Sequence, residues 1–555
     1  MASRTFDNMS EEMLKRFFGI NPEAATSAGV HDPYDMHLSH GGVKRLTDTL
    51  SLLMEWNKTA REMIASEELS AEQLLSIEVL KMTLNTHKFA VEDYPIWKMF
   101  PEALEIPGSA IFLMLSRNYA PYEKRMKAIS SRIGQLPRYL TQYRTRFDRT
   151  RTVTHWTEMA IETCRGFPAF LKYVGESSKD TIPESLHSEM LRNIERAEAA
   201  SVDHLKFLEE LLKNATPDFA MGKARFAKLM RIRLMTLTPD EMLAIGMRTL
   251  EELKQEKARL LEKMAPKGGG EADVYRQVHA DCAPTFEGVI EMVARDIQNA
   301  KEFIIKNQIA TIDPGTVIRV LETPEFLTYS VPSAALTMPA RFESVQGGEY
   351  LITRPKNPEE IGALWNRSSI INTSVHEAFP GHFHQGVMAN RKPWMHSLAN
   401  WLIGSDTMVT SWETMEGWAH YCEKMMYDHG YEASDAAYLA MLDGAIWRAC
   451  RVVYDIKLAY GEASIQEMAE MLAKEASTPY DAALSDVKGF SRAPGYAVSY
   501  LIGRYLVFEL KREFQNELGP EFDEKKFHDL LAENGNLPLY LARKAVRLGL
   551  RAGIR

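Results

Sequence analysis

Four side chains that can bind a metal ion or move a proton lie within the stretch HEAFPGHFHQ: His376, Glu377, His382 and His384. Imidazole nitrogens bind zinc and similar ions, and a carboxylate beside the metal can accept a proton from water that the metal activates. These are the residue types needed to hydrolyse a stable bond such as an amide. Such a site needs about three protein ligands and one open position, so further ligands must be sought elsewhere in the chain.

The spacing of this stretch is unusual. It begins like the H-E-x-x-H helix of zinc peptidases, but Pro380 stands where the second histidine should fall. On a regular helix His382 would lie roughly 240° around and about 9 Å along from His376, and His384 about 12 Å along. Pro380 lacks a backbone N–H and Gly381 accepts almost any backbone angle, so this pair can widen the turn. We therefore predict His376 and His382 as ligands, and His384 as a supporting or structural residue.

The same stretch also has an ordinary structural interpretation. Ser374 and Glu377 have the spacing of a capping box, in which the glutamate would only cap the start of a helix. Three histidines within nine positions could also be a chance cluster. A third ligand on another element would favour the metal site.

The segment WETMEGWAHYCEKMM offers that third ligand. Glu413, Glu416, His420 and Glu423 follow one another at steps of three, four and three residues, which places them on one helix face. The residues between them are mostly apolar, so the helix is predicted to be buried, and buried carboxylates need a cation or hydrogen-bond partners. We predict Glu416 as the third ligand, and the other three as residues that support the ligands or line the approach to them.

Both segments resemble motifs of known families. Two histidines on one helix and a glutamate on a later helix resemble the ligand plan of the gluzincin metallopeptidases, and MEGWAHYCE is similar to their N-E-G-F-A-x-Y-x-E segment. HEAFPGHFHQ followed by EGWAHYCE is similar to the H-E-x-x-P-G-H-H-x-Q and E-G-W-A-L-Y-A-E motifs of bacterial domain of unknown function family 885, which is thought to be zincin-like. The resemblance spans roughly residues 325–550, including RACRVVYDIKLAYG and APGYAVSYLIGR. It implies a zincin-like fold in which His376, His382 and Glu416 bind zinc.

The sequence departs from that family pattern in three places. Phe383 replaces the adjacent histidine of the first motif, Lys457 and Ala459 stand in the T-G-x-H ending, and Tyr496 replaces the glutamine after Pro-Gly. The predicted ligands and Glu377 are kept. The departures therefore concern the surroundings of the site.

Further candidate residues lie in the last hundred or so residues of the chain. Tyr500 is the candidate donor to the oxyanion that forms during amide hydrolysis, although it could equally be a core tyrosine of an amphipathic helix. Arg451, Arg492 and Arg504 are candidates for binding a substrate carboxylate. The favoured alternative for Arg451 is an internal ion pair with Asp455, four residues later.

These candidates leave the type of peptidase open. An arginine of this set, or Arg448, facing the metal would favour a carboxypeptidase. If instead the carboxylates of Glu413 and Glu423 face it, an aminopeptidase is favoured.

The elements that must position these residues are mostly helical. Up to about residue 310 apolar residues recur every three or four positions, which predicts an N-terminal helical lobe over 1–310. TVIRVLET, SAALTMPA and GEYLITR are short, rich in β-forming residues and separated by Pro and Gly, so they predict one small sheet over about 315–354. Helical periodicity then returns, and the family resemblance implies that residues 311–555 form a zincin-like catalytic lobe. The expected fold is mainly α with one small sheet, two helical lobes around a cleft, and GEYLITR presenting its edge to an extended peptide.

Composition limits the class of protein. The 555 residues carry a net charge of −9, which gives no support to a nucleic-acid or membrane partner. The first twenty residues lack the apolar core of a signal peptide, and no apolar run is long enough to cross a membrane. The four cysteines lie far apart, which predicts neither disulfides nor a cysteine zinc site: Cys164, Cys282, Cys422 and Cys450. We expect a cytoplasmic protein, and the sequence does not indicate its oligomeric state.

The function that these features favour is a zinc-dependent metallopeptidase, carboxypeptidase- or oligopeptidase-like, that hydrolyses short peptides with Zn²⁺ as cofactor and Glu377 as general base. The same site could hydrolyse a non-peptide amide. An oxidative di-metal carboxylate enzyme is a weaker alternative, because the paired Glu-x-x-His segments of such sites are missing. A catalytically inactive helical scaffold is the remaining alternative, and the intact Glu377 argues against it.

Overall fold

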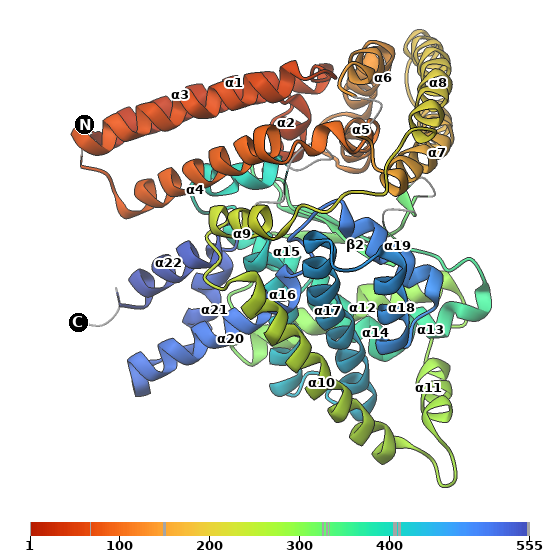
Figure 1. Cartoon of the computed structure of the whole chain (residues 1–555), viewed down its shortest axis with the longest axis vertical. Helices are drawn as coiled ribbons and strands as arrows, with labels where there is room; N and C mark the ends of the chain where they lie inside the picture. The colour runs from red at the N-terminus through yellow and green to blue at the C-terminus, as the bar shows by residue number, and fades with distance from the viewer. Residues whose placement is uncertain are drawn as a thin grey trace. The chain divides into compact units, whose positions relative to one another are not determined.

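The computed structural model describes residues 2–66, 68–147, 151–324, 327–328, 331, 333–402, 408 and 412–551. Over these residues the chain is mainly helical with one small sheet, as predicted (Figure 1). It divides into two compact units, the first made of Met1–Ala220, Ala340–Ser344 and Pro393–Thr410, and the second of Met221–Pro339, Val345–Lys392 and Ser411–Arg555. The boundary expected at residue 310 falls inside the second unit, whose helices include those between residues 223 and 306.

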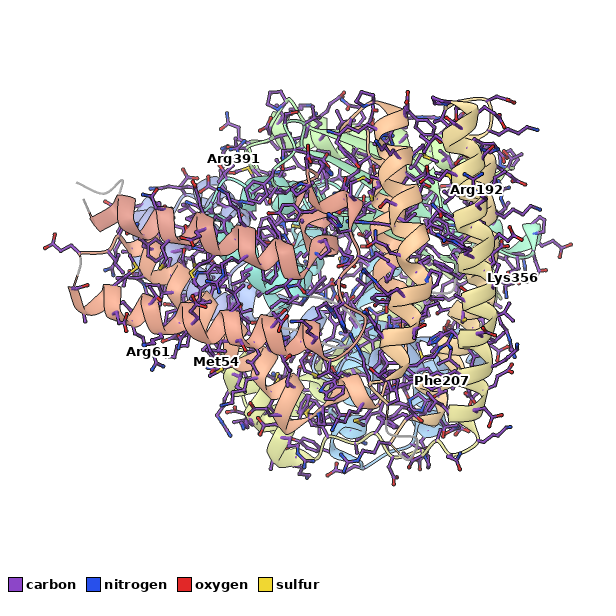
Figure 2. All side chains as sticks on the ribbon, turned by 90° about the horizontal axis from the view of Figure 1, so that it is seen from above. Met54, Arg61, Arg192, Phe207, Lys356 and Arg391 are labelled. Carbon is purple, nitrogen blue, oxygen red and sulfur yellow. The ribbon has the colours of Figure 1, made fainter. Side chains whose placement is uncertain are left out.

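The first unit consists of helices around a core of aromatic and aliphatic side chains, among them Phe17, Leu53 and Trp56, which are fully buried. Figure 2 shows Met54 and Arg61 projecting outward from α3, whereas Leu53 and Trp56 on the same amphipathic helix are buried. The helices of this unit are α1 (Ala2–Ile20), α2 (Pro22–Ala28), α3 (Lys44–Ser66), α4 (Ala71–Lys88), α5 (Glu105–Ser116), α6 (Tyr122–Arg144), α7 (Thr154–Ser178) and α8 (Glu184–Leu212).

The second unit contains every candidate site residue. Its helices before and after the sheet are α9 (Lys223–Ile232), α10 (Pro239–Met264), α11 (Glu271–Ala280), α12 (Phe286–Lys306), α13 (Ile361–Trp365), α14 (Arg367–Glu377), α15 (His382–Ala389), α16 (Glu413–Asp428), α17 (Asp435–Tyr460), α18 (Ile465–Glu475), α19 (Tyr480–Ser491), α20 (Ser499–Leu518), α21 (Glu524–Glu533) and α22 (Leu539–Arg551).

The three predicted strands form one sheet: β1 (Val317–Glu322), β2 (Ala334–Thr337) and β3 (Gly347–Ile352). The strand order is β1-β3-β2, with β3 parallel to β1 and antiparallel to β2. The expectation that GEYLITR offers a free edge to a peptide is therefore wrong, because β3 is the central strand and both of its edges are paired. A Cβ on Gly348 would lie only 2.9 Å from the Phe383 ring, so β3 packs directly against α15.

Helices α16 and α20 approach each other so closely that two glycines are required at the contact. A Cβ on Gly417 would lie 2.3 Å from the carbonyl carbon of Gly503, and a Cβ on Gly503 would lie 2.3 Å from the carbonyl oxygen of Glu413. Any side chain at either position would collide with backbone. This contact sets the backbone of α16 at Glu413 and Gly417 directly against α20 at Gly503.

Two further expectations concern the whole chain. All four cysteines are unpaired, as predicted. Among the described helices, none is long and apolar enough to cross a membrane.

Candidate metal centre

The histidine stretch is not a continuous helix. Helix α14 ends at Glu377 and α15 begins at His382, so the predicted irregularity is present as a full break rather than one widened turn. The Gly381 N–H donates to the carbonyl of Val375, six residues earlier, at 3.0 Å. A Cβ on Gly381 would lie 1.8 Å from the carbonyl oxygen of His376, so only glycine fits this turn.

The start of α14 excludes the capping-box interpretation of this stretch. Its N-cap is Asn366, whose side-chain oxygen accepts a hydrogen bond from the Ser369 N–H at 3.0 Å. Ser374 and Glu377 therefore lie in the last turns of the helix and not at its beginning. The carboxylate of Glu377 has no role in capping the N-terminus of a helix.

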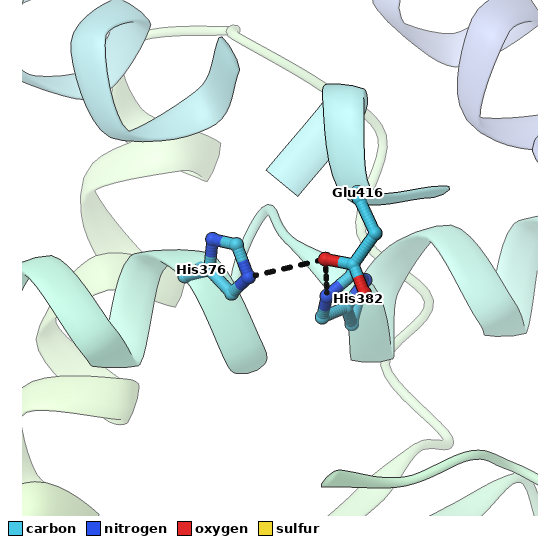
Figure 3. Close-up of side chains that lie close together, drawn as sticks. All are labelled: His376, His382 and Glu416. Carbon is cyan, nitrogen blue, oxygen red and sulfur yellow. Dashed lines mark ion pairs between the residues drawn. The ribbon is translucent and has the colours of Figure 1, made fainter. Parts of the chain in front are cut away.

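The break brings the three predicted ligands together (Figure 3). Oε2 of Glu416 lies 3.6 Å from Nε2 of His376 and 3.3 Å from Nε2 of His382. The two imidazole rings are nearly perpendicular, with centroids 4.8 Å apart, and one ligand atom from each of the three residues lies within 4.8 Å of the others. The side chains come from the end of α14, the start of α15 and the first turn of α16, and all three residues are buried.

The spacing and chemistry of these atoms fit a zinc ion. Ligands at zinc distances of about 2.0–2.2 Å in a tetrahedron are separated by roughly 3.3–3.6 Å, and the two distances from Oε2 of Glu416 to the imidazole nitrogens lie in this range. Oε2 of Glu416 is buried and has no hydrogen-bond partner among the described residues. A buried carboxylate oxygen facing two imidazole nitrogens is the arrangement that a cation would stabilise.

A buried carboxylate orients the first histidine. Oε1 of Glu423 lies 2.7 Å from Nδ1 of His376, and Nη2 of Arg448 lies 3.0 Å from the same oxygen. Burial disfavours the protonated His376, but its contacts with Glu416 and Glu423 outweigh burial and raise the pKa to about 9. Burial also opposes the charge on Glu423, yet Arg448 and His376 lower the pKa of that carboxyl. Nδ1 of His376 is thus the donor, and its Nε2 is directed at Glu416.

Two contacts that the sequence did not predict hold Glu416 and the break between α14 and α15 in place. The hydroxyl of Tyr496 donates a hydrogen bond of 3.0 Å to Oε1 of Glu416. The indole N–H of Trp418 donates to the carbonyl of Pro380 at 2.8 Å, which ties α16 to the break between α14 and α15. The only sequence signal for Tyr496 was its departure from the Pro-Gly-Gln pattern, which by itself assigned it no role.

The other two polar residues of the predicted stripe on α16, Glu413 and His420, are buried, as predicted, and each has a separate partner. Oε2 of Glu413 lies 3.2 Å from Nη2 of Arg233, and Nε2 of His420 lies 3.0 Å from Nη1 of Arg504. Burial lowers the pKa of His420 well below its usual range. Of the three supporting candidates on this helix, Glu423 contacts a predicted ligand directly.

His384 lies on α15 but outside the three-residue cluster. Burial lowers its pKa to about 4, so the ring is neutral near neutral pH. The charged groups that influence this pKa are Asp529, Arg391, His528 and Lys525, none of which belongs to the cluster. This is consistent with the structural role that the sequence suggested.

The expected ion pair between Arg451 and Asp455 is wrong. Arg451 instead pairs with Asp486, whose Oδ1 lies 2.7 Å from Nη2. Asp455 accepts backbone hydrogen bonds from Gly495 at 2.9 Å and Val498 at 3.1 Å. The four-residue spacing allowed a pair on one helix, but partners from α19 and the turn before α20 satisfy both side chains.

Glu377 and Tyr500 are both half-buried. No hydrogen bond or ion pair within the described part of the chain engages the Glu377 carboxylate. The Tyr500 ring is stacked on Tyr496 at 5.9 Å, and burial followed by the charge of Glu416 raises the pKa of its hydroxyl, which stays protonated. Arg492 caps the end of α19.

Two solved structures have a similar fold. One is described as a putative lipoprotein of unknown function from Shewanella oneidensis, with 18% identity, a TM-score of 0.75, and coverage of 97% of this chain and 99% of that one. Another is the putative lipoprotein from Colwellia psychrerythraea, with 17% identity, a TM-score of 0.80 and full coverage of both chains. No curated protein matches the chain.

These comparisons correct one expectation and establish the family. The cytoplasmic location expected from the sequence is not retained, because both solved proteins are described as lipoproteins. The sequence profile of a bacterial family described as "Bacterial protein of unknown function (DUF885)" matches residues 22–546. Because this match covers nearly the whole chain, the protein belongs to the DUF885 family.

Proposed function

We propose that this protein is a zinc-dependent metallopeptidase of the zincin-like, gluzincin type that hydrolyses short peptides. The observation that carries the proposal is the convergence of three buried side chains, with one unpartnered oxygen of Glu416 facing Nε2 of His376 at 3.6 Å and of His382 at 3.3 Å. Glu377 follows His376 directly in the sequence, as the H-E pair of zinc peptidases requires.

Each residue around the cluster has a defined task in this proposal. Zinc, when bound, would supply a Lewis acid that activates water and polarises the substrate carbonyl. Nε2 of His376 and of His382 and Oε2 of Glu416 would hold the ion. Glu423, itself held by Arg448, keeps one proton of His376 on Nδ1, so that Nε2 is the nitrogen that would lose its proton and bind the ion.

Proton transfer falls to Glu377. Its carboxylate is half-buried and is not engaged by any ion pair among the described residues, so it is free to accept a proton from water and deliver it to the leaving amine nitrogen. Tyr500 keeps its proton and is the candidate donor to the developing oxyanion. The scaffold alternative assigns no task to an unpaired carboxylate at this position.

Digestion of a mixed peptide library tests the proposal. The purified protein should contain about one zinc per chain, cut short peptides, and lose this activity when zinc is removed by a chelator and regain it when zinc is returned. Mass spectrometry of the products also shows whether cleavage occurs near the carboxyl end, near the amino end or inside the peptide. Iron in place of zinc, no bound metal, or cleavage that persists without metal would contradict the proposal.

A further inference from the structure

We infer that an aromatic surface next to the candidate metal centre binds a large apolar, preferably aromatic, side chain of the substrate beside the bond that is cut. This inference rests on the proposed function and adds a substrate class to it. The surface consists of four half-buried residues that we call the aromatic wall: Trp412, Phe490, Tyr496 and Tyr500.

The wall is a continuous set of ring contacts drawn from three segments. Tyr496 is at its centre, with ring centroids 4.9 Å from Trp412, 5.4 Å from Phe490 and 5.9 Å from Tyr500. Phe490 and Tyr500 also meet edge to face at 6.1 Å. All of these distances lie in the range of favourable aromatic pairs, and the rings remain partly exposed, so another ring can be added to the set.

The wall begins at the metal cluster itself. The hydroxyl of Tyr496 lies 3.0 Å from Oε1 of Glu416, so one member of the wall contacts a predicted ligand. Successive residues of an extended peptide are about 3.5 Å apart. A peptide whose reacting carbonyl lies at the cluster would therefore place a neighbouring side chain within reach of the wall.

A half-buried ion pair, Arg451 with Asp486, packs against the rings. The guanidinium of Arg451 lies 4.5 Å from the centre of the Phe490 ring and 4.7 Å from that of Tyr500. Asp486 accepts a hydrogen bond from this guanidinium at 2.7 Å and another from the indole N–H of Trp447 at 3.1 Å. The wall is thus ordered before any ligand binds, which lowers the entropic cost of binding.

Two arginines beside the wall already have carboxylate partners. Arg451 is paired with Asp486, and Arg448 is paired with Glu423 at 3.0 Å. A carboxylate side chain would lose water here without gaining either of these cations. An aromatic or large aliphatic side chain would bury apolar surface against the rings, so the chemistry of the wall favours the apolar class.

Peptide binding to a catalytically silenced protein tests the inference without requiring turnover. Calorimetric titration of the full-length Glu377→Gln protein uses an alanine pentapeptide and variants with Phe, Leu or Asp at each position in turn. We expect Phe in at least one position to tighten binding about tenfold or more over Ala, Leu to have a smaller effect, and Asp none. Equal binding of the Phe and Ala peptides, or tighter binding of Asp, would overturn the inference.

Variants in the same background locate the effect. With Phe490→Ala, the affinity for the Phe-containing peptide should exceed that for the alanine peptide by no more than about threefold, and the zinc content should be unchanged. With Phe490→Leu, part of the preference for the Phe-containing peptide should remain. Phe508, eight residues beyond Tyr500 on α20, contacts Tyr421 rather than the wall, so Phe508→Ala should keep the full preference. A preference that survives Phe490→Ala would overturn the assignment, and Phe490→Leu supplies the comparison if the alanine variant does not fold.

The outcomes separate the two proposals. If the wild-type protein binds zinc and cuts peptides but shows no aromatic preference, the aromatic wall is wrong and the proposed function stands. If the preference is present but there is neither zinc nor cleavage, the wall is a binding site in a protein without this hydrolytic activity.

Discussion

The hydroxyl of Tyr496 donates a hydrogen bond of 3.0 Å to the carboxylate of Glu416, and this bond engages only one of the two carboxylate oxygens. Oε1 accepts the tyrosine proton, and Oε2 is left facing His376 and His382. The contact depends on the close approach of α16 and α20, because Gly417 is next to Glu416 and lies against Gly503. A single side chain outside the predicted ligand set thus determines which oxygen is available to a cation.

Removing the Tyr496 hydroxyl should weaken metal binding. With Tyr496→Phe we expect the zinc affinity to fall about tenfold, since the loss of a partner that orients a ligand typically costs 10- to 100-fold. Competition with a chromogenic chelator measures this affinity. Tyr496→Gln, which restores an N–H donor, should recover part of the loss. The control is Tyr500→Phe, which removes a hydroxyl from the neighbouring stacked ring; if it weakens zinc binding equally, the hydrogen bond to Glu416 is not the cause.

Glu377→Gln should separate binding from catalysis. The variant should keep about one zinc per chain and lose about 10²- to 10⁴-fold in kcat, because an amide cannot accept the proton from water. The substitution preserves shape and removes only the charge. Glu470, an exposed glutamate on α18, provides the matched control, and Glu470→Gln should be fully active. Full activity of Glu377→Gln would show that another group accepts the proton.

Zinc affinity should rise with pH because a proton and the metal compete for His376. In the metal-free protein the neighbouring carboxylates raise the pKa of His376 to about 9, so below that pH the imidazole must lose a proton before it can bind a metal. The affinity should increase up to about tenfold per pH unit and level off near pH 9. Chelator competition at several pH values measures the slope.

Glu423→Gln tests the cause of this dependence. Its loss removes one of the two carboxylates that favour the protonated ring, so the affinity should level off at a lower pH. An unchanged pH profile in this variant would mean that Glu423 does not set the protonation of His376.

Alanine at two glycines should change stability in opposite directions. Gly503→Ala would place a Cβ 2.3 Å from the carbonyl oxygen of Glu413, so we expect the free energy of unfolding to fall by about 1–3 kcal/mol. A Cβ on Gly489, in α19, would meet open space, and Gly489→Ala should raise stability by about 0.5–1 kcal/mol. Chemical denaturation compares the two variants, and equal effects would contradict the close contact of α16 with α20.

The sequence by itself determined the local features. Apolar periodicity predicted the helices, β-forming residues between Pro and Gly predicted the three strands, and the apolar residues around Glu416 predicted that its helix is buried. The Pro-Gly pair also predicted that the turn between His376 and His382 could depart from a regular helix. Each of these properties depends on residues that are near one another in the chain.

Only the tertiary structure decided the features that depend on long-range packing. In the tertiary structure β3 is the central strand of the sheet, and Arg451 pairs with Asp486 and not with Asp455 as expected. Tyr496 contacts Glu416, which lies eighty residues earlier in the chain. Spacing along one helix shows which side chains can meet, but competing partners on other elements decide which of them do. Those competitors are fixed by how whole helices pack, here through a glycine contact whose partner is far away in the sequence.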